Sequence, residues 1–484
     1  MKPILSKAVS VSAIFMRFRS QIGLLTCCIL LAAGGLLLTA CDLSSILPQS
    51  RSPTGEPEAL TAELPSAETP TATVPSTMTT IVFWEPYPLD RPEGQLLLEM
   101  ARDFEAATPG VRVEVAAKSG VLGVYEAILL QRQEGGDLPD LAVAFPSSIA
   151  ELAEQGLVVP LDLFINDPEL GLSDADLADI YSSTLEAGRF PLLGGQLLAF
   201  PFAHNVIGMW VNDSLLAQAG WQQPPVTWTE FEQACYDVWA QTAVRCLPFV
   251  ESVSVFDAWL YSRGGQQLSD DGTRATFNSP AGTDSLTLLR QLIDSGLAWR
   301  PEEEYGDYLA FAHGQATFAF SSTGNNRLYT EAYSQALQSG TAAFDWHQAM
   351  IPQADPSHPA TVLYGPSFFI LGSYPEREQT AWRLLRWLTS TVQTARWADK
   401  LAAMPARASA LAVMTDTLAV YPFIRQQAEA ILPYARPEPA VTAEFQVRDI
   451  LYAAIISVTQ GYTNPQAALD VAALEVNAIL AEQP

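Results

Sequence analysis

The stretch from Gln196 to Asp213, which reads QLLAFPFAHNVIGMWVND, restricts the fold more than any other part of the sequence. It contains two extended apolar runs, one before Pro201 and one from Val206 to Val211, and it has no helical period. Because proline cannot donate a hydrogen bond within a sheet, one sheet should end near Pro201 and another should begin after it. The chain would then cross between two lobes, with His204 and Asn205 facing a cleft. The alternative is a bent strand inside one sheet.

Length and charge limit the classes of function. The chain has 484 residues, which is enough for two or three domains. Its net charge of −27 argues against a nucleic-acid partner, which requires a basic surface. The same charge argues against long-range attraction of a strongly anionic ligand, although a local basic pocket stays compatible with it.

The N-terminus has the pattern of a targeting segment. Basic residues precede an apolar run, Ile22 to Leu38, and Leu38-Thr39-Ala40-Cys41 follows. This resembles the lipobox of bacterial lipoproteins, so we expect a signal peptide over residues 1–41 and lipidation of Cys41. The alternative is an uncleaved membrane anchor. Both interpretations place the globular part outside the cytoplasm, held at the extracytoplasmic face of the cell membrane.

Residues 42–79 are rich in Pro, Ser, Thr and Glu, and this composition predicts a disordered tether.

Two cysteines remain in the mature chain, because Cys27 and Cys28 would leave with the signal peptide and Cys41 would carry lipid. In an oxidising compartment we expect Cys235 and Cys246 to form a disulfide between a helix end and the next strand. The alternative is two buried free thiols.

The folded part begins at Thr80 with alternating strands and helices. Apolar periodicity predicts strands at 81–84, 111–115 and 141–145, with helices at 95–106 and 125–133 between them. This order implies a parallel sheet with right-handed crossovers, in which ligands lie beyond the carboxyl ends of the strands. Those ends are Trp84-Glu85 and the loop Phe145-Pro146-Ser147-Ser148.

A second α/β region follows Asp213. Thr227 and Glu230 form a predicted capping box at the start of a helix. Val362 to Phe368 is another kinked extended run and a second candidate crossing. Two amphipathic helices, Thr442 to Val458 and Pro465 to Leu480, end the chain.

A family resemblance rests on these motifs taken in order. The run LGGQLLAFPFAHNVIGMWVNDSLLAQAGWQQPPVTWTEF resembles the signature of ABC-transporter solute-binding proteins of the sugar type (family 1), a group that includes maltose- and glycerophosphate-binding proteins. IVFWEP, ATPGVRVEV, GDLPDLAVAF, AEQGLVVPL, FAHGQATFAFSS, WRLLRWLTS, MPARASA and NPQAALDVAALEVNAIL match other pieces in the same order. The resemblance covers Thr80 to the C-terminus.

This resemblance implies an α/β, two-lobed periplasmic-binding-protein fold of type II, with a ligand cleft at the hinge. It places residues 80–203 and 367–410 in one lobe and residues 204–366 and 411–484 in the other. It also implies a monomer without cofactor, metal or catalysis that captures a carbohydrate and delivers it to ABC permease subunits.

Candidate ligand-binding residues follow from their positions in the family pattern, because aromatic rings cover sugar faces and polar side chains bond sugar hydroxyls. They are Trp84, Glu85, Tyr125, Phe145, Ser147, His204, Asn205, Ser254, Trp259, Ser321, Ser322, Tyr364, Gly365, Arg407 and Arg436.

Several of these residues have a structural interpretation too. Trp84 and Trp259 are also typical of core aromatics, and Glu85 of a solvated charge. Ser321 and Ser322 could satisfy backbone groups, and Arg407 could form a structural ion pair. We interpret His204 as a neutral hinge side chain, since no second His or Cys lies at metal-ligand spacing.

Two further observations bear on ligand and chemistry. Family members that take glycerol phosphates carry an acidic residue where this chain has Phe145 to Ser148, which favours neutral sugars here. No GxSxG, HExxH, P-loop or GxGxxG motif is present. A secreted glycoside hydrolase would need two acids facing one pocket, and the predicted cleft has only Glu85. A lipid-anchored adhesion or scaffold protein would have no buried polar cleft.

Overall fold

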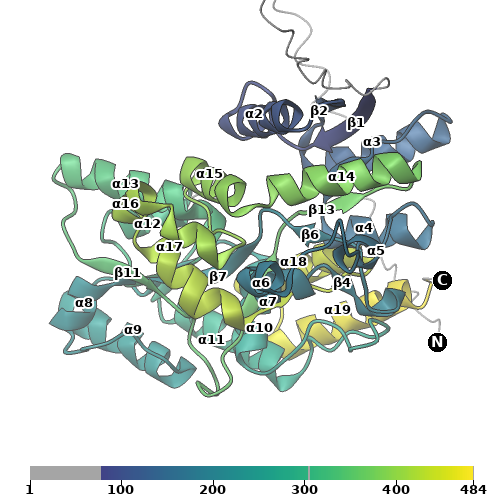
Figure 1. The fold of residues 1–484 in the computed structure, drawn as a ribbon. Coiled ribbons are helices and arrows are strands. Elements are labelled where there is room, and N and C mark those ends of the chain that lie inside the picture. Colours follow the sequence, from purple (N-terminus) through teal and green to yellow (C-terminus); the bar gives the residue numbers. More distant parts are fainter. Residues whose placement is uncertain (1–77, 304–305, 483–484) are drawn as a thin grey trace, which may run out of the picture. The chain divides into compact units, whose positions relative to one another are not determined.

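The computed structural model describes residues 78–303 and 306–482 (Figure 1). The expected signal peptide, Cys41 and nearly all of the expected tether lie outside these residues. Folded structure begins one residue earlier than predicted, at Thr79. No described helix is long and apolar enough to cross a membrane.

The first sheet contains the three predicted parallel strands, one strand antiparallel to them, β13, and a short edge strand, β6, that pairs with β13. β1 pairs in parallel with β2 and β3, and β13 pairs antiparallel with β3 and β6. In spatial order the strands are β2 (Val111–Ala117), β1 (Thr79–Glu85), β3 (Leu141–Ala144), β13 (Ser367–Ile370) and β6 (Phe200–Pro201).

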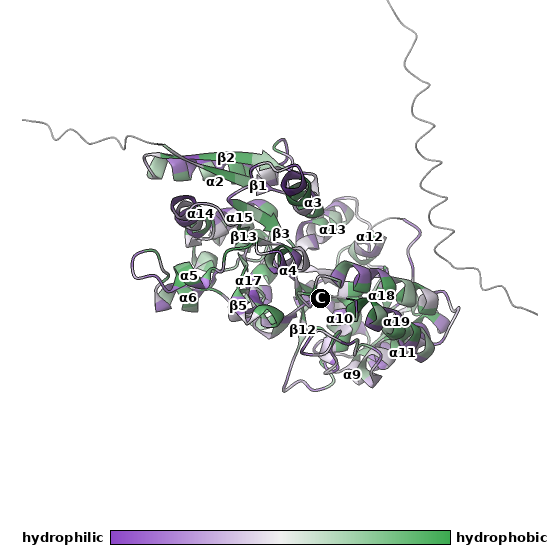
Figure 2. Cartoon of the chain, turned by 90° about the vertical axis from the view of Figure 1, so that its right-hand side faces the viewer, coloured by the Kyte–Doolittle hydropathy of each residue, from purple (hydrophilic) through white to green (hydrophobic). Residues whose placement is uncertain are grey.

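Helices cover both faces of this sheet, because successive side chains of a strand point to opposite faces. Phe83 packs in a core with side chains of α2 (Pro92–Ala107) and α14 (Pro375–Leu388). Its neighbour Trp84 packs in a different core with α3 (Gly120–Gln133) and α4 (Pro146–Glu154). In Figure 2 the strands β1, β3 and β13 lie among these helices.

The second sheet is built around β7. In spatial order its strands are β10 (Phe318–Ser322), β7 (Asn205–Asn212), β12 (Thr361–Tyr364) and β14 (Ala435–Pro437), and β11 (Trp346–Ala349) also pairs with β7. Alternate residues of β7 again enter different cores. Ile207, Met209 and Val211 lie in the largest one, whereas Trp210 stacks on Tyr329 with 4.2 Å between ring centroids.

Helices cover this sheet as well. The largest core takes side chains from six helices, and Figure 2 shows α11, α18 and α19 beside one another, as their contacts require. The six helices are α8 (Asp213–Gln218), α9 (Trp228–Thr242), α10 (Val253–Ser262), α11 (Pro280–Asp294), α18 (Glu444–Thr459) and α19 (Pro465–Leu480). The core around Trp210 includes side chains of α12 (Gly306–Ala312), α13 (Asn326–Gln338) and α15 (Thr391–Leu401).

Short elements complete the described chain. They are α5 (Asp162–Ile165), α6 (Asp174–Asp179), α7 (Ser182–Glu186), β4 (Arg189–Phe190), η2 (Pro191–Leu193), β5 (Gln196–Leu197), β8 (Leu247–Pro248), β9 (Ala298–Trp299), η3 (Thr323–Asn325), η4 (Ala408–Ala412), α16 (Thr415–Val420), α17 (Phe423–Gln426), η5 (Gln427–Ile431) and η6 (Leu432–Tyr434).

The chain passes between the two sheets where the sequence predicts it. β6 ends at Pro201 in the first sheet, and β7 begins at Asn205 in the second. The second kinked run behaves in the same way, because β12 ends at Tyr364 in the second sheet and β13 begins at Ser367 in the first. We call these two connections the crossings. The alternative of one bent strand in a single sheet is therefore wrong.

Local sequence explains where several elements begin. The Thr227 hydroxyl accepts from the backbone N–H of Glu230, and the Glu230 carboxylate accepts from the backbone N–H of Thr227, which confirms the predicted capping box. Pro146 is the first residue of α4, since proline is well suited to a helix start. The segment Pro146 to Ser148 is therefore the first turn of a helix and not the expected loop.

Cys235 and Cys246 form the predicted disulfide. Its position differs in one respect: Cys235 lies in the middle of α9 and not at a helix end. Cys246 directly precedes β8, so the bond joins α9 to this short strand.

Candidate functional site

A cavity of about 240 Å³ lies at the two crossings. We call it the crossing cavity. The start of α4, both crossings, the ends of β12 and β14, the segment after β14 and the start of α18 all contribute to its wall. The lining residues are Phe145, Pro146, Ser147, Ala187, His204, Leu363, Tyr364, Gly365, Pro437, Glu438, Pro439, Glu444, Phe445 and Arg448.

Five predicted site residues line this cavity: Phe145, Ser147, His204, Tyr364 and Gly365. Phe145 lies between β3 and α4, and the next turn of α4 places Ser147 beside it. The Phe145 ring packs edge-on against the Phe445 ring, with 6.1 Å between the ring centroids. Two aromatic rings from distant parts of the chain therefore form one wall, and such rings suit the C–H face of a sugar.

His204 lies in the first crossing and is buried. Its Nε2 and the Ser367 Oγ share a hydrogen bond of 2.9 Å, whereas Nδ1 has no partner in the described structure. Burial lowers the pKa of His204 to about 4, so the ring is neutral at pH 7. Among the described residues no group of three or more His, Cys, Asp or Glu side chains is placed to hold a metal ion.

The second crossing contributes Tyr364 and Gly365. Burial raises the pKa of Tyr364, so its hydroxyl stays protonated and can donate a hydrogen bond. Gly365 has a φ of 127°, and a Cβ atom there would lie 2.4 Å from the carbonyl oxygen of Ala203. Only glycine lets the two crossings approach this closely.

Asn205, Ser321 and Ser322 lie near the crossings, but they do not line the cavity. The Asn205 amide donates to the Ala203 carbonyl, and its Oδ1 accepts from Thr323. Ser321 accepts from Asn325, and Ser322 accepts from the backbone N–H of Gly324. Each polar group thus has a local structural partner.

Trp84, Glu85 and Tyr125 belong to the first sheet and its helices, away from the cavity wall. Trp84 is a core aromatic, and the Lys118 Nζ lies 3.6 Å from its ring centroid. Glu85 is not the solvated charge of the alternative interpretation, because it is fully buried and burial raises its pKa to about 7. Tyr125 packs partly buried against the same core as Trp84.

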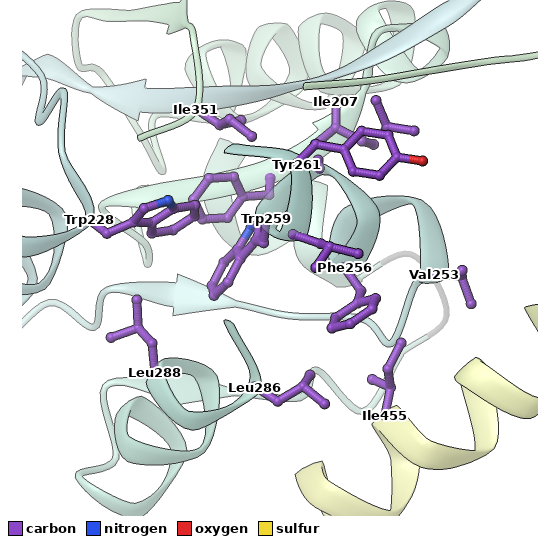
Figure 3. Close-up of a cluster of buried hydrophobic side chains, with 14 of the residues drawn as sticks. Ile207, Trp228, Val253, Phe256, Trp259, Tyr261, Leu286, Leu288, Ile351 and Ile455 are labelled. Carbon is purple, nitrogen blue, oxygen red and sulfur yellow. The ribbon is translucent and has the colours of Figure 1, made fainter. Parts of the chain in front are cut away.

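Trp259 is also a core residue. Figure 3 shows it beside Trp228 in the largest core, and their ring centroids are 4.6 Å apart. Ser254 does not line the cavity but contacts two residues that do. Its hydroxyl donates to Glu438 and accepts from Arg448.

The two predicted arginines lie elsewhere. Arg407 is buried, donates to the Thr389 carbonyl and pairs with Asp179 at 3.2 Å, so it has the structural role of the alternative interpretation. Arg436 is exposed and lines a second cavity of about 360 Å³, which shares Ala187 and Pro437 to Pro439 with the crossing cavity.

The charged and aromatic lining residues that the sequence analysis missed are Glu438, Glu444, Phe445 and Arg448. Glu438 and Arg448 form an ion pair, and burial raises the pKa of Glu444 well above its usual range. The expectation that Glu85 is the acid of the cleft is therefore wrong, because Glu438 and Glu444 occupy that place. The spacing of four between Glu444 and Arg448 on an amphipathic helix is the signal that could have identified these two residues.

Comparison with known proteins gives consistent results. Residues 99–423 match the family described as bacterial extracellular solute-binding protein. A binding protein of Brucella abortus is 24% identical over 405 residues, which are 80% of this chain and 90% of that protein. An ABC transporter-binding protein of Deinococcus radiodurans is 26% identical over 324 residues, or 62% of this chain and 75% of that protein.

Solved structures show the same fold. The sugar-binding protein MalE from Xanthomonas citri has a TM-score of 0.70 at 20% identity, covering 84% of this chain and 98% of that one. The cyclic alpha-maltosyl-1,6-maltose binding protein from Arthrobacter globiformis gives 0.68 at 21% identity, with 84% and 100% covered. UgpB from Mycobacterium tuberculosis, in complex with glycerophosphocholine, gives 0.64 at 22%, with 84% and 99% covered. These similarities confirm the predicted two-lobed α/β fold.

Proposed function

Because this chain belongs to the bacterial extracellular solute-binding protein family, we propose that it captures a carbohydrate outside the cytoplasm and delivers it to the permease of an ABC importer. One observation carries this proposal. The crossing cavity combines two aromatic rings, Phe145 and Phe445, with polar side chains, and its wall brings the start of α4, which follows the first sheet, together with β12 and β14 of the second sheet. A sugar needs this combination of an apolar face and hydrogen-bonding groups.

The proposed mode of action is binding without chemistry. A ligand that contacts residues on both sides of the crossings stabilises the conformation of the chain in which it can make all of these contacts at once. We assign residues 80–203 and 367–410 to one lobe and residues 204–366 and 411–484 to the other, with the crossings as the hinge. The named similar proteins are binding proteins, which supports a role without turnover.

We further propose that a signal peptide is removed before Cys41 and that this thiol is lipidated, which would hold a monomeric protein at the outer face of the membrane. A Cys41→Ser variant should appear in the culture medium, whereas the unaltered chain should stay with the membrane fraction. Release of both forms would contradict the anchor.

Calorimetry against a panel of mono- and oligosaccharides tests the proposed function. Phe445→Ala should weaken the affinity for a bound sugar by about ten-fold or more, because it removes one face of the aromatic wall. Tyr462→Ala is the matched control, since this tyrosine is 78% exposed and lies outside the cavity wall. Absence of binding to every sugar, or equal effects of both variants, would contradict the proposal.

A glycoside hydrolase is the second candidate, because Glu438 and Glu444 line one cavity. Glu438 is already paired with Arg448, which favours a structural role for that carboxylate. Thin-layer chromatography of each sugar after incubation separates the two functions. Release of product from an unmodified glycoside would replace binding with hydrolysis.

A further inference from the structure

The wall between the two cavities contains a group of buried carboxyls that the binding of a neutral sugar does not explain. Asp257, Glu438 and Glu444 lie here with Gln267 and Arg448, and we call these five residues the acidic cluster. Glu438 lines both cavities, Glu444 lines the crossing cavity, and Gln267 lines the second one. Asp257 is fully buried in α10.

Hydrogen bonds hold the acidic cluster together but leave part of it without partners. The Gln267 Nε2 donates to Asp257 Oδ2 and to Glu444 Oε1, each at 3.2 Å. Arg448 donates to Glu438 and to the Ser254 hydroxyl. Three buried oxygens of the acidic cluster have no hydrogen-bond partner in the described chain: Asp257 Oδ1, Glu444 Oε2 and Gln267 Oε1.

The third oxygen, Gln267 Oε1, belongs to an amide and not to a carboxyl. Gln267 is 1% exposed, and its amide lies between the two acids that it bonds. A buried acceptor without a donor is costly, and here three of them converge around one amide. The neighbouring side chains therefore offer these oxygens no donor other than the acid protons of Asp257 and Glu444.

The charges lead to the same conclusion. The acidic cluster has three carboxyls and one guanidinium, and that guanidinium is paired with Glu438. Tyr261 and Arg436 also act electrostatically on this region, and burial keeps the Tyr261 hydroxyl neutral by raising its pKa. If Asp257 and Glu444 ionise, neither has a cationic side chain of its own among the described residues.

A primary ammonium matches this arrangement, because it provides three donors, no acceptor and one positive charge. A sugar hydroxyl provides a single donor and brings acceptor lone pairs of its own. A metal ion fits less well, since no group of described side chains has the required arrangement.

We propose that the ligand is an amine-bearing carbohydrate whose ammonium group binds between Asp257, Glu444 and Gln267. This inference rests on the proposed function, and it specifies the substrate class of the same site. The sugar ring would occupy the crossing cavity against Phe145 and Phe445, and the amine would enter the wall that both cavities share.

Binding should also release protons. Burial raises the pKa of Asp257 and Glu444, so these carboxyls hold protons in the unliganded protein. An ammonium favours their ionised forms, and the protons then pass to the buffer. Calorimetry in buffers with different ionisation enthalpies measures this release.

Isothermal titration calorimetry with matched sugars tests the inference. Each hexose or disaccharide is compared with its 2-amino and 2-acetamido forms, which place an ammonium or a neutral amide at one position. We expect the amino form to bind about ten-fold more tightly than both neutral forms and to release protons. Glu444→Gln and Asp257→Asn should each bring the ratio of affinities close to one.

Asp449→Asn is the matched control, because it removes the same charge from an exposed carboxylate on the same helix. It should keep the preference for the amino form. If circular dichroism shows that either acidic-cluster variant is unfolded, the affinity ratio and the proton release of the unaltered protein decide whether the inference holds.

The outcomes separate the inference from the function on which it rests. Binding of neutral sugars, with equal or weaker binding of their amino forms, would overturn the inference and leave carbohydrate capture intact. Absence of binding by every sugar would remove both. Equally tight binding of spermidine, an amine without a sugar ring, would overturn the carbohydrate part of the assignment.

Discussion

His204 Nε2 and Ser367 Oγ, which lie 2.9 Å apart, join the two crossings through a buried hydrogen bond. His204 precedes β7 of the second sheet, and Ser367 begins β13 of the first. The bond therefore links the backbone segments on which the cavity depends. Because the His204 ring is neutral at pH 7, it needs no anionic partner there, and the neutral Ser367 hydroxyl is sufficient.

Acidification should destabilise the fold through His204. The folded pKa of about 4 lies below the ordinary histidine pKa of 6.5, so the unfolded chain takes up the proton first and stability falls as the pH decreases from 6.5 to 4. Relative to the unaltered protein, His204→Gln should recover about 2 to 3 kcal/mol between pH 7 and pH 4.5.

Urea unfolding at the two pH values measures this difference. His313→Gln is the control, because His313 is exposed and its replacement should leave the pH dependence unchanged. An identical pH dependence in His204→Gln and the unaltered protein would contradict the assignment.

Glu85 should have the opposite effect. Its folded pKa of about 7 is above the ordinary glutamate pKa of 4.5, so the stability that it contributes is present below pH 4.5 and is lost as the pH rises through 7. Glu85→Gln should therefore gain about 2 to 3 kcal/mol over the unaltered protein between pH 5 and pH 8. Denaturant midpoints at these pH values provide the measurement, with exposed Glu126→Gln as control. If the difference in stability between Glu85→Gln and the unaltered protein did not change with pH, Glu85 would be ionised throughout this pH range.

Gly365→Ala should destabilise the second crossing. Its φ of 127° disfavours any side chain, and the added Cβ would meet the Ala203 carbonyl. We expect a loss of about 1 to 3 kcal/mol in the free energy of unfolding. Gly372→Ala is the matched control, because a Cβ there meets only the Leu157 carbonyl at 3.8 Å. Equal unfolding midpoints for the two variants would show that the crossing tolerates a side chain.

Removal of the disulfide should lower stability. Cys235 and Cys246 are separated by 11 residues and are fully buried, so the bond restricts a short loop in the unfolded chain. A variant with both cysteines replaced by alanine should lose about 2 to 3 kcal/mol. Thermal unfolding with and without reductant provides the control, since reductant should affect only the protein with the bond. Insensitivity of the unaltered protein to reductant would argue against a formed disulfide.

The sequence predicts the features of this fold that depend on local chemistry. Pro201 breaks a strand because it lacks an N–H group, and the structure has its break between sheets at that point. Thr227 and Glu230 are three residues apart, so their reciprocal capping is visible without any tertiary information. The order of strands and helices is equally local, and it yields the parallel part of the first sheet.

The site is predicted less completely because its residues meet over long separations. Ser254 contacts Glu438, 184 positions away, and Gln267 contacts Glu444, 177 positions away. No periodic pattern encodes such contacts, so the acidic cluster was missed. Ser322 shows the converse problem: it is the last residue of a strand, as expected for a site residue, but its hydroxyl caps the turn that follows.

The crossings also run side by side, because β7 pairs with β12 at Asn205 and Tyr364 while β6 pairs with β13 at Pro201 and Ser367. A single connecting strand would allow torsion about its own bonds. Two paired strands resist twisting. The deformation that costs least is therefore bending about the line that joins the two crossings. Any opening of the ligand site should therefore follow one direction, so that a ligand leaves by the path along which it entered.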